Sequence, residues 1–378
     1  MSTKIKLKIL VLGQAPLSKT LNRERFFLEL LSHSYDNVVY HSVEIHKGII
    51  LRSYRKICRM LEKDVDLLRI PYNERNNVNQ IIAEEAPDCI LSLSSLITGR
   101  ISNFRQVVTW ADAVFSNIIG LYDNYKKLDP LSLAFGHQLE RRAIQRSQIF
   151  ATTSTWSSQI AQSTYCKKMN KVNIATIPRC AILPTLPEYT QRHFEDKETL
   201  NLLLITSDWE RKGGDYVLNL SKLLISNGIE HRLHIIGDCP THIEKKPHIT
   251  GYGYLNKSDP NDWKLWMSIM NMIHYSLLFS FADFTPNTIY ESYAFGVPVM
   301  ANRIGATPEM VVDSRSGYLI QNIDNMNQLI TQLEPLLLER KQWAEQSSYC
   351  RKLYETRYSD SALLENLQNA IIECTKTV

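Results

Sequence analysis

The chain has 378 residues, more than a single hydrophobic core usually supports, so its length predicts two domains, or three. With 44% hydrophobic and 22% charged residues it has the composition of a globular protein, and no apolar window approaches the roughly 20 residues of a membrane-spanning helix. Its 43 basic and 39 acidic residues leave a net charge of +4, too small to indicate nucleic-acid binding. The seven cysteines are scattered and never form a Cys-x-x-Cys pair, which argues against a disulfide framework and a zinc site and fits a reducing cytoplasm.

Short apolar runs alternate with longer helical stretches, the pattern of β–α units around a parallel sheet. In the first half of the chain, strands are predicted at Lys8–Gly13, Val38–Val43, Cys89–Leu93, Val107–Trp110 and Ile149–Thr152. Helices are predicted at Asn22–Ser34 and Leu131–Arg146.

The stretch HKGIILRSYRKICRMLEK at 46–63 gathers basic side chains around a row of apolar ones. A helix of this kind can lie on an anionic membrane surface and meet a lipid-linked molecule there. A solvated helix that packs its apolar side on the sheet fits the same pattern, so both interpretations stay open.

Prolines and charged residues interrupt the pattern in PRCAILPTLPEYTQRHFEDKETL, which is typical of an interdomain linker. We therefore predict a first domain at 1–187 and a second at 188–355, with a C-terminal helix at 356–378 that packs back on the first. Strands of the second series are predicted at Leu202–Thr206, Arg232–Gly237, Ile249–Gly251, Ser276–Ser280, Val297–Ala301 and Gly317–Ile320. Helical stretches at 325–352 and about 360–375 close the chain.

Parallel sheets bind ligands beyond the carboxyl ends of their strands, so the strand-to-helix loops are the candidate sites. The loop after Leu202–Thr206 places Arg211 and Lys212 beside Gly213 and Gly214. Glycines let the backbone approach a ligand, and two cations can neutralise a diphosphate. An ordinary surface turn with solvated charges is an equally good interpretation of this loop.

The second candidate loop lies in FADFTPNTIYESYAFGVPV. Thr285 is suited to the N-cap and Pro286 to the first position of a helix that runs from Asn287 to about Phe295. The N-terminus of such a helix attracts phosphate. Glu291, further along the same helix, can accept hydrogen bonds from two ribose hydroxyls. Asp283 at the strand end can reach whatever the diphosphate carries. In the alternative interpretation, Asp283 assists the cap and Glu291 is a solvated helix residue.

The pattern D-x-x-P-N-T-x-x-E, followed by AFGVPVMANRIGATPEMV, resembles the signature of the family 4 retaining glycosyltransferases. WERKGGD is similar to the diphosphate-binding stretch of that family, and ITGYGYLNKSDPNDW to the strand and helix between the two. VTWADAVF, the run ERRAIQRSQIFATTSTWSSQIAQSTY and KVNIATIPRCA follow the family order upstream. The resemblance covers about residues 105–320, whereas the first hundred residues resemble nothing so closely. It implies the α/β GT-B fold, with two Rossmann-like domains of doubly wound parallel sheets that face a central cleft.

The resemblance also implies roles for the residues of both candidate loops. The donor-binding positions that it implies are Arg211, Lys212, Gly213, Asn287, Thr288 and Glu291. Asp283 takes the place of a catalytic-site glutamate that contacts the donor sugar, and its side chain is one methylene shorter. Arg179 in PRCA and Ala306 in RIGATPE are two further departures from the family pattern.

In the first domain, the resemblance implies that Asp112 of VTWADAVF points at the sugar as a second catalytic residue, although a helix N-cap explains it equally well. Gly13 and Gln14 follow the first strand and are expected to line the cleft. His137 is interpreted as structural. Asp64-Val65-Asp66 has the Asp-x-Asp pattern of metal-dependent transferases, but it follows the basic run instead of a strand, so we predict no metal site.

The implied function is transfer of a hexose from a UDP- or GDP-sugar, with retention of configuration and without a metal or cofactor. The implied acceptor is a glycan, a lipid-linked molecule or another glycoconjugate in surface polysaccharide synthesis, at the inner face of the membrane or in the cytoplasm. Two alternatives are a sugar-nucleotide epimerase and a non-catalytic GT-B-like subunit that binds a partner enzyme or a glycan.

Overall fold

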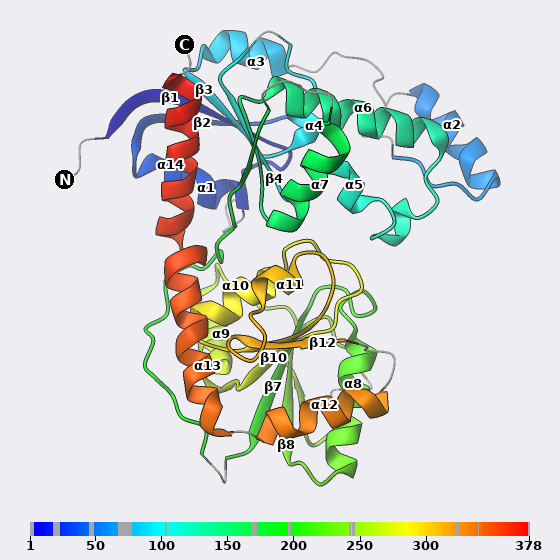
Figure 1. The fold of residues 1–378 in the computed structure, drawn as a ribbon, viewed down its shortest axis with the longest axis vertical. Helices are drawn as coiled ribbons and strands as arrows, with labels where there is room; N and C mark the ends of the chain where they lie inside the picture. The colour runs from blue at the N-terminus through cyan, green and yellow to red at the C-terminus, as the bar shows by residue number, and fades with distance from the viewer. Residues whose placement is uncertain are drawn as a thin grey trace. The chain divides into compact units, whose positions relative to one another are not determined.

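The computed structural model describes residues 4–17, 23–44, 49–66, 78–102, 104–167, 172–195, 198–241, 243, 246–321, 326–338 and 340–376. The chain forms two compact units, which Figure 1 shows in chain order by colour. The first unit comprises Met1–Arg179 and Leu363–Val378, and the second comprises Cys180–Ala362.

The first unit contains a six-stranded sheet in the order β2-β1-β3-β4-β5-β6, with every pairing parallel. Its strands are β1 (Ile5–Gly13), β2 (Tyr35–Ser42), β3 (Cys89–Ser92), β4 (Val107–Ala111), β5 (Ile149–Thr152) and β6 (Asn173–Thr176). Its helices are α1 (Arg23–Ser32), α2 (Ile49–Met60), α3 (Val78–Glu85), α4 (Ser95–Thr98), α5 (Phe115–Ile118), the 3-10 helix η1 (Asp123–Tyr125), α6 (Pro130–Arg146), α7 (Thr155–Tyr165) and α14 (Asp360–Lys376). The five strands predicted here are confirmed, and β6 was not predicted.

The second unit contains another parallel six-stranded sheet, in the order β12-β11-β10-β7-β8-β9. Its strands are β7 (Leu200–Thr206), β8 (His231–Gly237), β9 (Ile249–Gly251), β10 (Tyr275–Leu278), β11 (Val299–Asn302) and β12 (Gly317–Ile320). Its helices are α8 (Gly214–Ser226), α9 (Pro260–Met272), α10 (Asn287–Ala294), α11 (Thr307–Met310), α12 (Met326–Leu338), α13 (Arg340–Leu353) and the π-helix η2 (Tyr354–Tyr358). All six predicted strands are confirmed, and the strand order is that of the Rossmann fold, with its reversal between β7 and β10.

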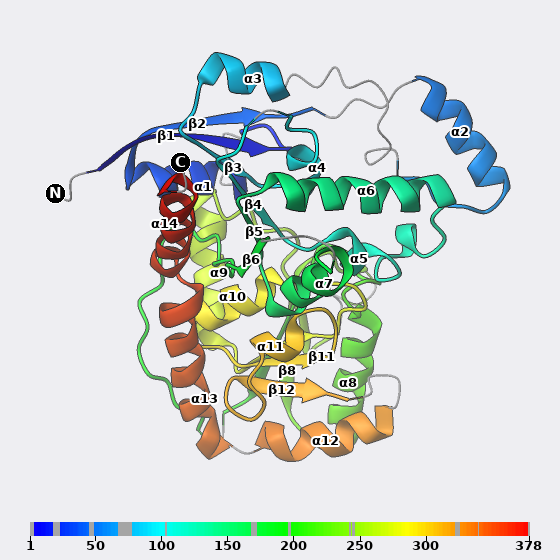
Figure 2. The ribbon, with the colours of Figure 1, turned by 45° about the horizontal axis from the view of Figure 1, so that its top comes forward.

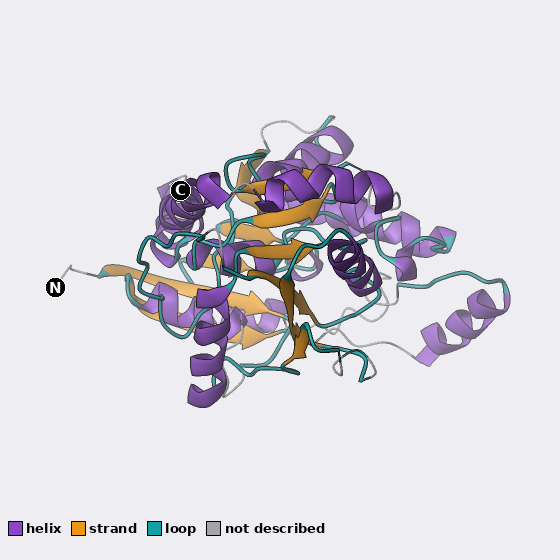
Figure 3. Ribbon diagram, turned by 90° about the horizontal axis from the view of Figure 1, so that it is seen from below, coloured by secondary structure: helices purple, strands orange, loops and turns teal. Residues whose placement is uncertain are grey.

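Burial explains why the strands could be read from apolar runs. Strands β3, β4, β5, β10 and β12 are buried along their whole length, as expected for parallel sheets that helices cover on both faces (Figure 3). Helix α6 begins one residue before its predicted start at Leu131, and α6 and α9 have the same kind of N-terminus. Asp129 and Asp259 each accept two backbone N–H bonds as N-caps, and a proline follows each in the first helical position.

The two units divide at Arg179 and Cys180, earlier in the chain than the predicted boundary after residue 187. Cys180 is buried, and its thiol hydrogen-bonds the Asp360 carboxyl group, which holds this part of the proline-rich segment in the second unit. The chain returns to the first unit at Leu363, and Asn173 of β6 donates a hydrogen bond of 2.9 Å to Glu373 of α14. None of the helices in the described ranges is both long and apolar enough to cross a membrane.

Candidate functional site

Three charged residues meet at the strand reversal of the second unit. The Lys212 Nζ lies 2.5 Å from Asp283 Oδ2, and the Arg211 Nη1 lies 3.8 Å from the same oxygen. Arg211 also pairs through Nε with Asp208 Oδ2 at 3.1 Å. The structure therefore brings together the two predicted diphosphate-binding cations and the shortened carboxylate, which contacts both of them.

Backbone contacts fix the loops that carry these residues. The Arg211 carbonyl accepts the Phe281 N–H at 2.8 Å, and its guanidinium donates to the Ala282 carbonyl at 2.9 Å. Gly213 has φ +71°, and a Cβ there would lie 2.2 Å from the Phe279 carbonyl oxygen. Only glycine fits this crossing of the loops after β7 and β10, so a contact with the protein's own backbone already requires Gly213.

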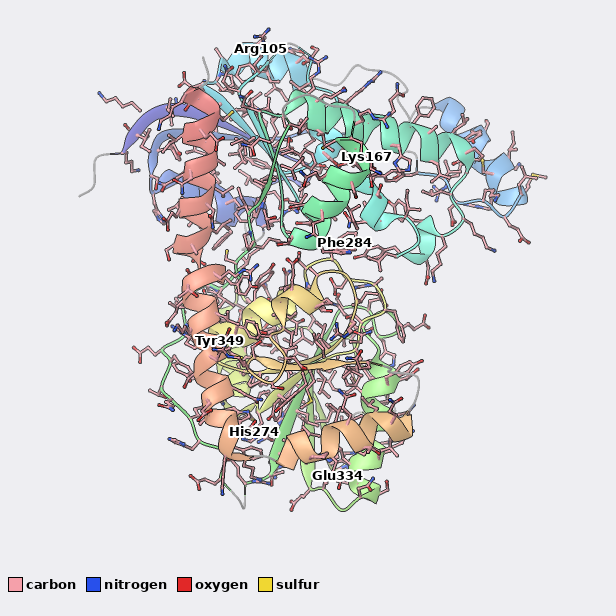
Figure 4. All side chains as sticks on the ribbon, in the orientation of Figure 1. Arg105, Lys167, His274, Phe284, Glu334 and Tyr349 are labelled. Carbon is pink, nitrogen blue, oxygen red and sulfur yellow. The ribbon has the colours of Figure 1, made fainter. Side chains whose placement is uncertain are left out.

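The loop between β11 and α11 contacts the backbone of Asp283. Gly305 has φ +53°, and a Cβ there would lie 2.1 Å from the Asp283 carbonyl oxygen. The Ala306 N–H donates to the carbonyl of Phe284, a residue that Figure 4 labels. Ala306 is fully buried, so the departure from glycine at this position leaves the support intact.

Helix α10 starts one residue later than its predicted cap implies. The N-cap is Pro286, in extended geometry and without a side-chain hydrogen bond to the helix, so the prediction of Thr285 as N-cap was wrong. Pro286 lacks an N–H, and its fixed φ of −63° sets the turn into the helix. Asn287 and Thr288 form the first turn, where the backbone N–H groups have no partner inside the helix.

Glu291 lies on α10 and is only 7% exposed, so its interpretation as a solvated helix residue was wrong. Its Oε1 forms a short ion pair with Lys257 Nζ, in the loop between β9 and α9. Lys257 also lies over the Trp266 ring, with Nζ 4.3 Å from the ring centroid. Lys257 was not predicted as a site residue, because nothing in a single sequence links a loop lysine to a glutamate 34 positions away.

In the first unit, Asp112 follows β4 and lies between two guanidinium groups. Its Oδ2 is 3.4 Å from Arg23 Nη1, and its Oδ1 is 3.3 Å from Arg179 Nη1. Its backbone carbonyl accepts the Thr153 hydroxyl at 2.8 Å. The N-cap of the following helix α5 is Val114, so the cap interpretation of Asp112 was wrong. Arg179, where the chain departs from the family pattern, is therefore an ion-pair partner of Asp112. Arg23 is a second ion-pair partner of Asp112, and it was not predicted.

Gly13 and Gln14 lie at the strand reversal of the first sheet, between β1 and β3. The Gln14 Oε1 accepts a hydrogen bond from Ser94 Oγ at 3.3 Å, which joins the two loops. A Cβ on Gly13 would lie 2.5 Å from the Tyr40 hydroxyl, so this glycine permits a close approach of β2.

The remaining polar candidates have structural contacts. His137 Nδ1 lies 2.9 Å from the Tyr165 hydroxyl. The Asp66 N–H donates to Ser132 Oγ at 3.0 Å, and Asp64 Oδ2 accepts the Lys127 N–H at 3.3 Å. Within the described ranges, no three His, Cys, Asp or Glu side chains gather in a metal-binding arrangement.

Comparison with known proteins finds a family model that matches the part of the chain carrying the second-unit cluster. Residues 200–339 match the family model of glycosyl transferases group 1, and this range contains Arg211, Lys212, Lys257, Asp283 and Glu291. An uncharacterized 41.2 kDa protein in the cps region of Klebsiella pneumoniae is 24% identical over 173 residues, which are 45% of this chain and 45% of that protein. The chain is aligned with less than half the length of the curated relatives that it matches.

Solved structures match nearly the whole chain. Sucrose-phosphate synthase from Thermosynechococcus elongatus has a TM-score of 0.68 at 11% identity, covering 99% of this chain and 100% of that one. HepE from Anabaena, in complex with UDP-glucose, has a TM-score of 0.64 at 14% identity, covering 97% and 99%. With two parallel six-stranded sheets and these neighbours, the chain has the GT-B fold, as predicted. The group 1 match and the fold together support a glycosyltransferase.

Proposed function

We propose that the chain is a retaining, metal-independent glycosyltransferase of family 4 that transfers a hexose from a UDP- or GDP-sugar. The observation that carries the proposal is the meeting of Arg211, Lys212 and Asp283 at the strand reversal of a Rossmann-ordered sheet. Nucleotides bind sheets of this kind at that point, beyond the carboxyl ends of the strands. The group 1 match over 200–339 and the UDP-glucose complex of HepE support the same donor class.

In the proposed reaction, Lys212 and Arg211 exchange Asp283 for the diphosphate of the donor. The bond from the anomeric carbon to the diphosphate oxygen breaks, and negative charge builds on the departing group. Cations held at that oxygen, with the free N–H groups of Asn287 and Thr288, stabilise this charge and lower the barrier. The acceptor oxygen bonds to the same face of the sugar, and its proton leaves with the diphosphate.

Asp283 is then free to contact the donor sugar, and Glu291 binds the ribose. In the first unit, Asp112 and the loop of Gly13 and Gln14 are proposed to contact the sugar and the acceptor. The two arginines around Asp112 fix the orientation of its carboxylate. Asp283 has one methylene less than glutamate, so we expect it to select among donor sugars by reach.

The acceptor is proposed to be a glycan, a lipid-linked molecule or another glycoconjugate in surface polysaccharide synthesis, which is consistent with the cps-region relative. Helix α2 is the proposed membrane contact, from the cytoplasmic side. Its Tyr54 hydroxyl donates a hydrogen bond to Asp129, the N-cap of α6, and Figure 2 shows α2 beyond that end of α6. Its outer side exposes Ile57 by 56%, Met60 by 77% and Leu61 by 66%. The exposed cations around them are Arg55, Lys56, Arg59 and Lys63. Residues 45–48, at the start of the basic run, lie outside the described residues.

One alternative keeps a specific observation in its favour. Asp283 is short and already engaged by Lys212, as expected if the chain were a non-catalytic GT-B subunit that binds a partner enzyme or a glycan. The structure adds no observation that favours a sugar-nucleotide epimerase.

A thermal-shift screen of UDP-, GDP- and ADP-sugars, followed by an assay for slow release of nucleoside diphosphate, tests the proposal. Lys212→Ala and Glu291→Ala are expected to abolish release, and Lys222→Ala on exposed α8 surface is the matched control. EDTA is expected to leave the rate unchanged. Binding without release indicates the non-catalytic subunit, interconversion of two sugar nucleotides indicates the epimerase, and no binding at all overturns the proposal.

A further inference from the structure

The ion pair between Lys257 and Glu291 is built into the second unit and not a chance surface contact. The side chains are 19% and 9% exposed, respectively. The backbone on both sides of Lys257 is fixed, because the Asn256 N–H donates to Asp262 Oδ2 at 2.9 Å and the Ser258 N–H to Asn256 Oδ1 at 3.1 Å. The loop therefore delivers the ammonium group to one place beside α10.

The pair has N–H donors and a carboxylate oxygen left over. An ammonium group carries three N–H donors. One contacts Glu291 Oε1, and the Trp266 ring face lies 4.3 Å from the nitrogen. No other hydrogen bond of Lys257 is made among the described residues, and Glu291 Oε2 likewise has no partner there. An N–H donor and a carboxylate oxygen therefore remain side by side.

This arrangement complements two neighbouring hydroxyl groups. One hydroxyl can donate to Glu291 Oε2, while the oxygen of its neighbour accepts from Lys257. Because Lys257 engages Oε1, the carboxylate offers one oxygen, Oε2, and the second hydroxyl of a diol is bound by the ammonium donor. Hydrogen bonds to charged groups are the stronger ones, so each missing hydroxyl is costly at this site.

We propose that Lys257 is a ribose-binding residue that acts with Glu291 to select ribonucleotides over deoxyribonucleotides. The inference rests on the proposed function, because it assumes that Glu291 faces the ribose of the donor. It adds a residue and a selectivity to that function. The Trp266 ring keeps the ammonium group in place when the nucleotide arrives.

Calorimetric titration with UDP and 2′-deoxy-UDP, and with GDP and 2′-deoxy-GDP, tests this inference. The wild-type chain is expected to bind the ribonucleotide about tenfold or more tightly than its 2′-deoxy form, the ratio expected for a hydrogen bond to a charged group. Lys257→Met keeps the apolar stem over Trp266 and removes the charge. This variant is expected to bind the ribonucleotide about tenfold more weakly than the wild-type chain and the deoxynucleotide almost as tightly. The ratio of its affinities for the two nucleotides therefore approaches one. Lys264→Met, on the exposed side of α9, removes the same charge and is expected to keep the wild-type ratio.

Because both nucleotides are titrated into the same variant, a change in the ratio of their affinities reports on binding and not on loss of folded protein. If Lys257→Met is unstable because Glu291 is left unpaired, the double variant Lys257→Met/Glu291→Gln is compared with the single variant Glu291→Gln, so that the difference between their affinity ratios reports on Lys257 alone. A wild-type chain that binds UDP and GDP no better than their 2′-deoxy forms overturns the inference and leaves the proposed function standing. So does a Lys257→Met chain that keeps the wild-type ratio. A wild-type chain that binds no nucleoside diphosphate overturns the proposed function itself.

Discussion

Buried histidines in the second unit make its stability depend on acid, and burial lowers the pKa most for two of them, His234 and His274. Asn201 of β7 contacts both: its side-chain Oδ1 accepts from His234 Nε2 at 3.1 Å, and its backbone N–H donates to His274 Nδ1 at 2.9 Å. His234 Nδ1 is 2.8 Å from the Tyr252 hydroxyl. Both rings are thus hydrogen-bonded as neutral imidazoles, and Figure 4 labels His274.

Burial lowers the pKa of His234 to about 4, helped by the charge of Arg232. Burial also lowers the pKa of His274 to about 3, helped by the nearby charges of Arg192 and Arg340. The Glu198 carboxylate lies 3.2 Å from His274 Nε2 and favours the charged form of the ring, but the Glu198 side chain is 41% exposed, so water screens this interaction. An unfolded histidine titrates near pH 6.5, so between that pH and the folded values the unfolded state binds more protons.

The stabilising effect of the neutral rings is therefore complete above pH 6.5 and is lost as the pH falls toward 4 and 3. From pH 7 to pH 5, linkage gives a loss of about 2 kcal/mol for each histidine, or about 4 kcal/mol together. Urea unfolding at the two pH values, followed by tryptophan fluorescence, measures it, because the Trp343 indole donates to the His274 carbonyl at 2.7 Å.

His234→Gln removes one titrating ring while keeping a donor for Asn201, so it is expected to reduce the pH-dependent loss by about half. His193→Gln, at an exposed position of the same unit, is the matched control and is expected to keep the full loss. A loss below about 1 kcal/mol in the wild-type chain, or an unchanged loss in His234→Gln, would refute the reasoning.

Two further outcomes are expected. Gly213→Ala forces a Cβ against the Phe279 carbonyl, so it is expected to destabilise the fold by about 2 kcal/mol or more in thermal unfolding and to impair nucleotide binding. Gly228→Ala, where φ is +74° and the surrounding space is open, is expected to destabilise the fold by about 1 kcal/mol. Equal destabilisation by the two substitutions would contradict the loop crossing described for Gly213. The wild-type chain is expected to co-sediment with vesicles of phosphatidylglycerol but not with vesicles of phosphatidylcholine. The bound fraction is expected to fall as salt is added, and to be lower in the double variant Met60→Ser/Leu61→Ser than in the wild-type chain. Ile225→Ser, at a 50% exposed position on α8, is its control, and binding that ignores lipid charge and both substitutions would remove α2 as the membrane contact.

The sheets could be predicted from sequence because parallel strands buried on both faces are short apolar runs, such as LNLLLIT in β7. Strand β6 was missed because NIAT is only partly buried and mixes polar with apolar residues. The residues of the Arg211, Lys212 and Asp283 cluster were identified from their loops, but their pairing with one another was not. Lys257 is 34 positions from Glu291, and Asp112 is 89 positions from Arg23, so only the fold brings these partners together.

The return of the chain to the first unit at Leu363 affects how this protein can be made. In topological terms, the second unit is an insertion within the first. Helix α14 buries Leu367, Ile371 and Cys374, so the first sheet lacks part of its cover until residues 363–376 have been synthesised. The second unit, which is continuous in sequence, can complete its core before the first. A truncation at the C-terminus therefore acts on the sheet that is translated earliest.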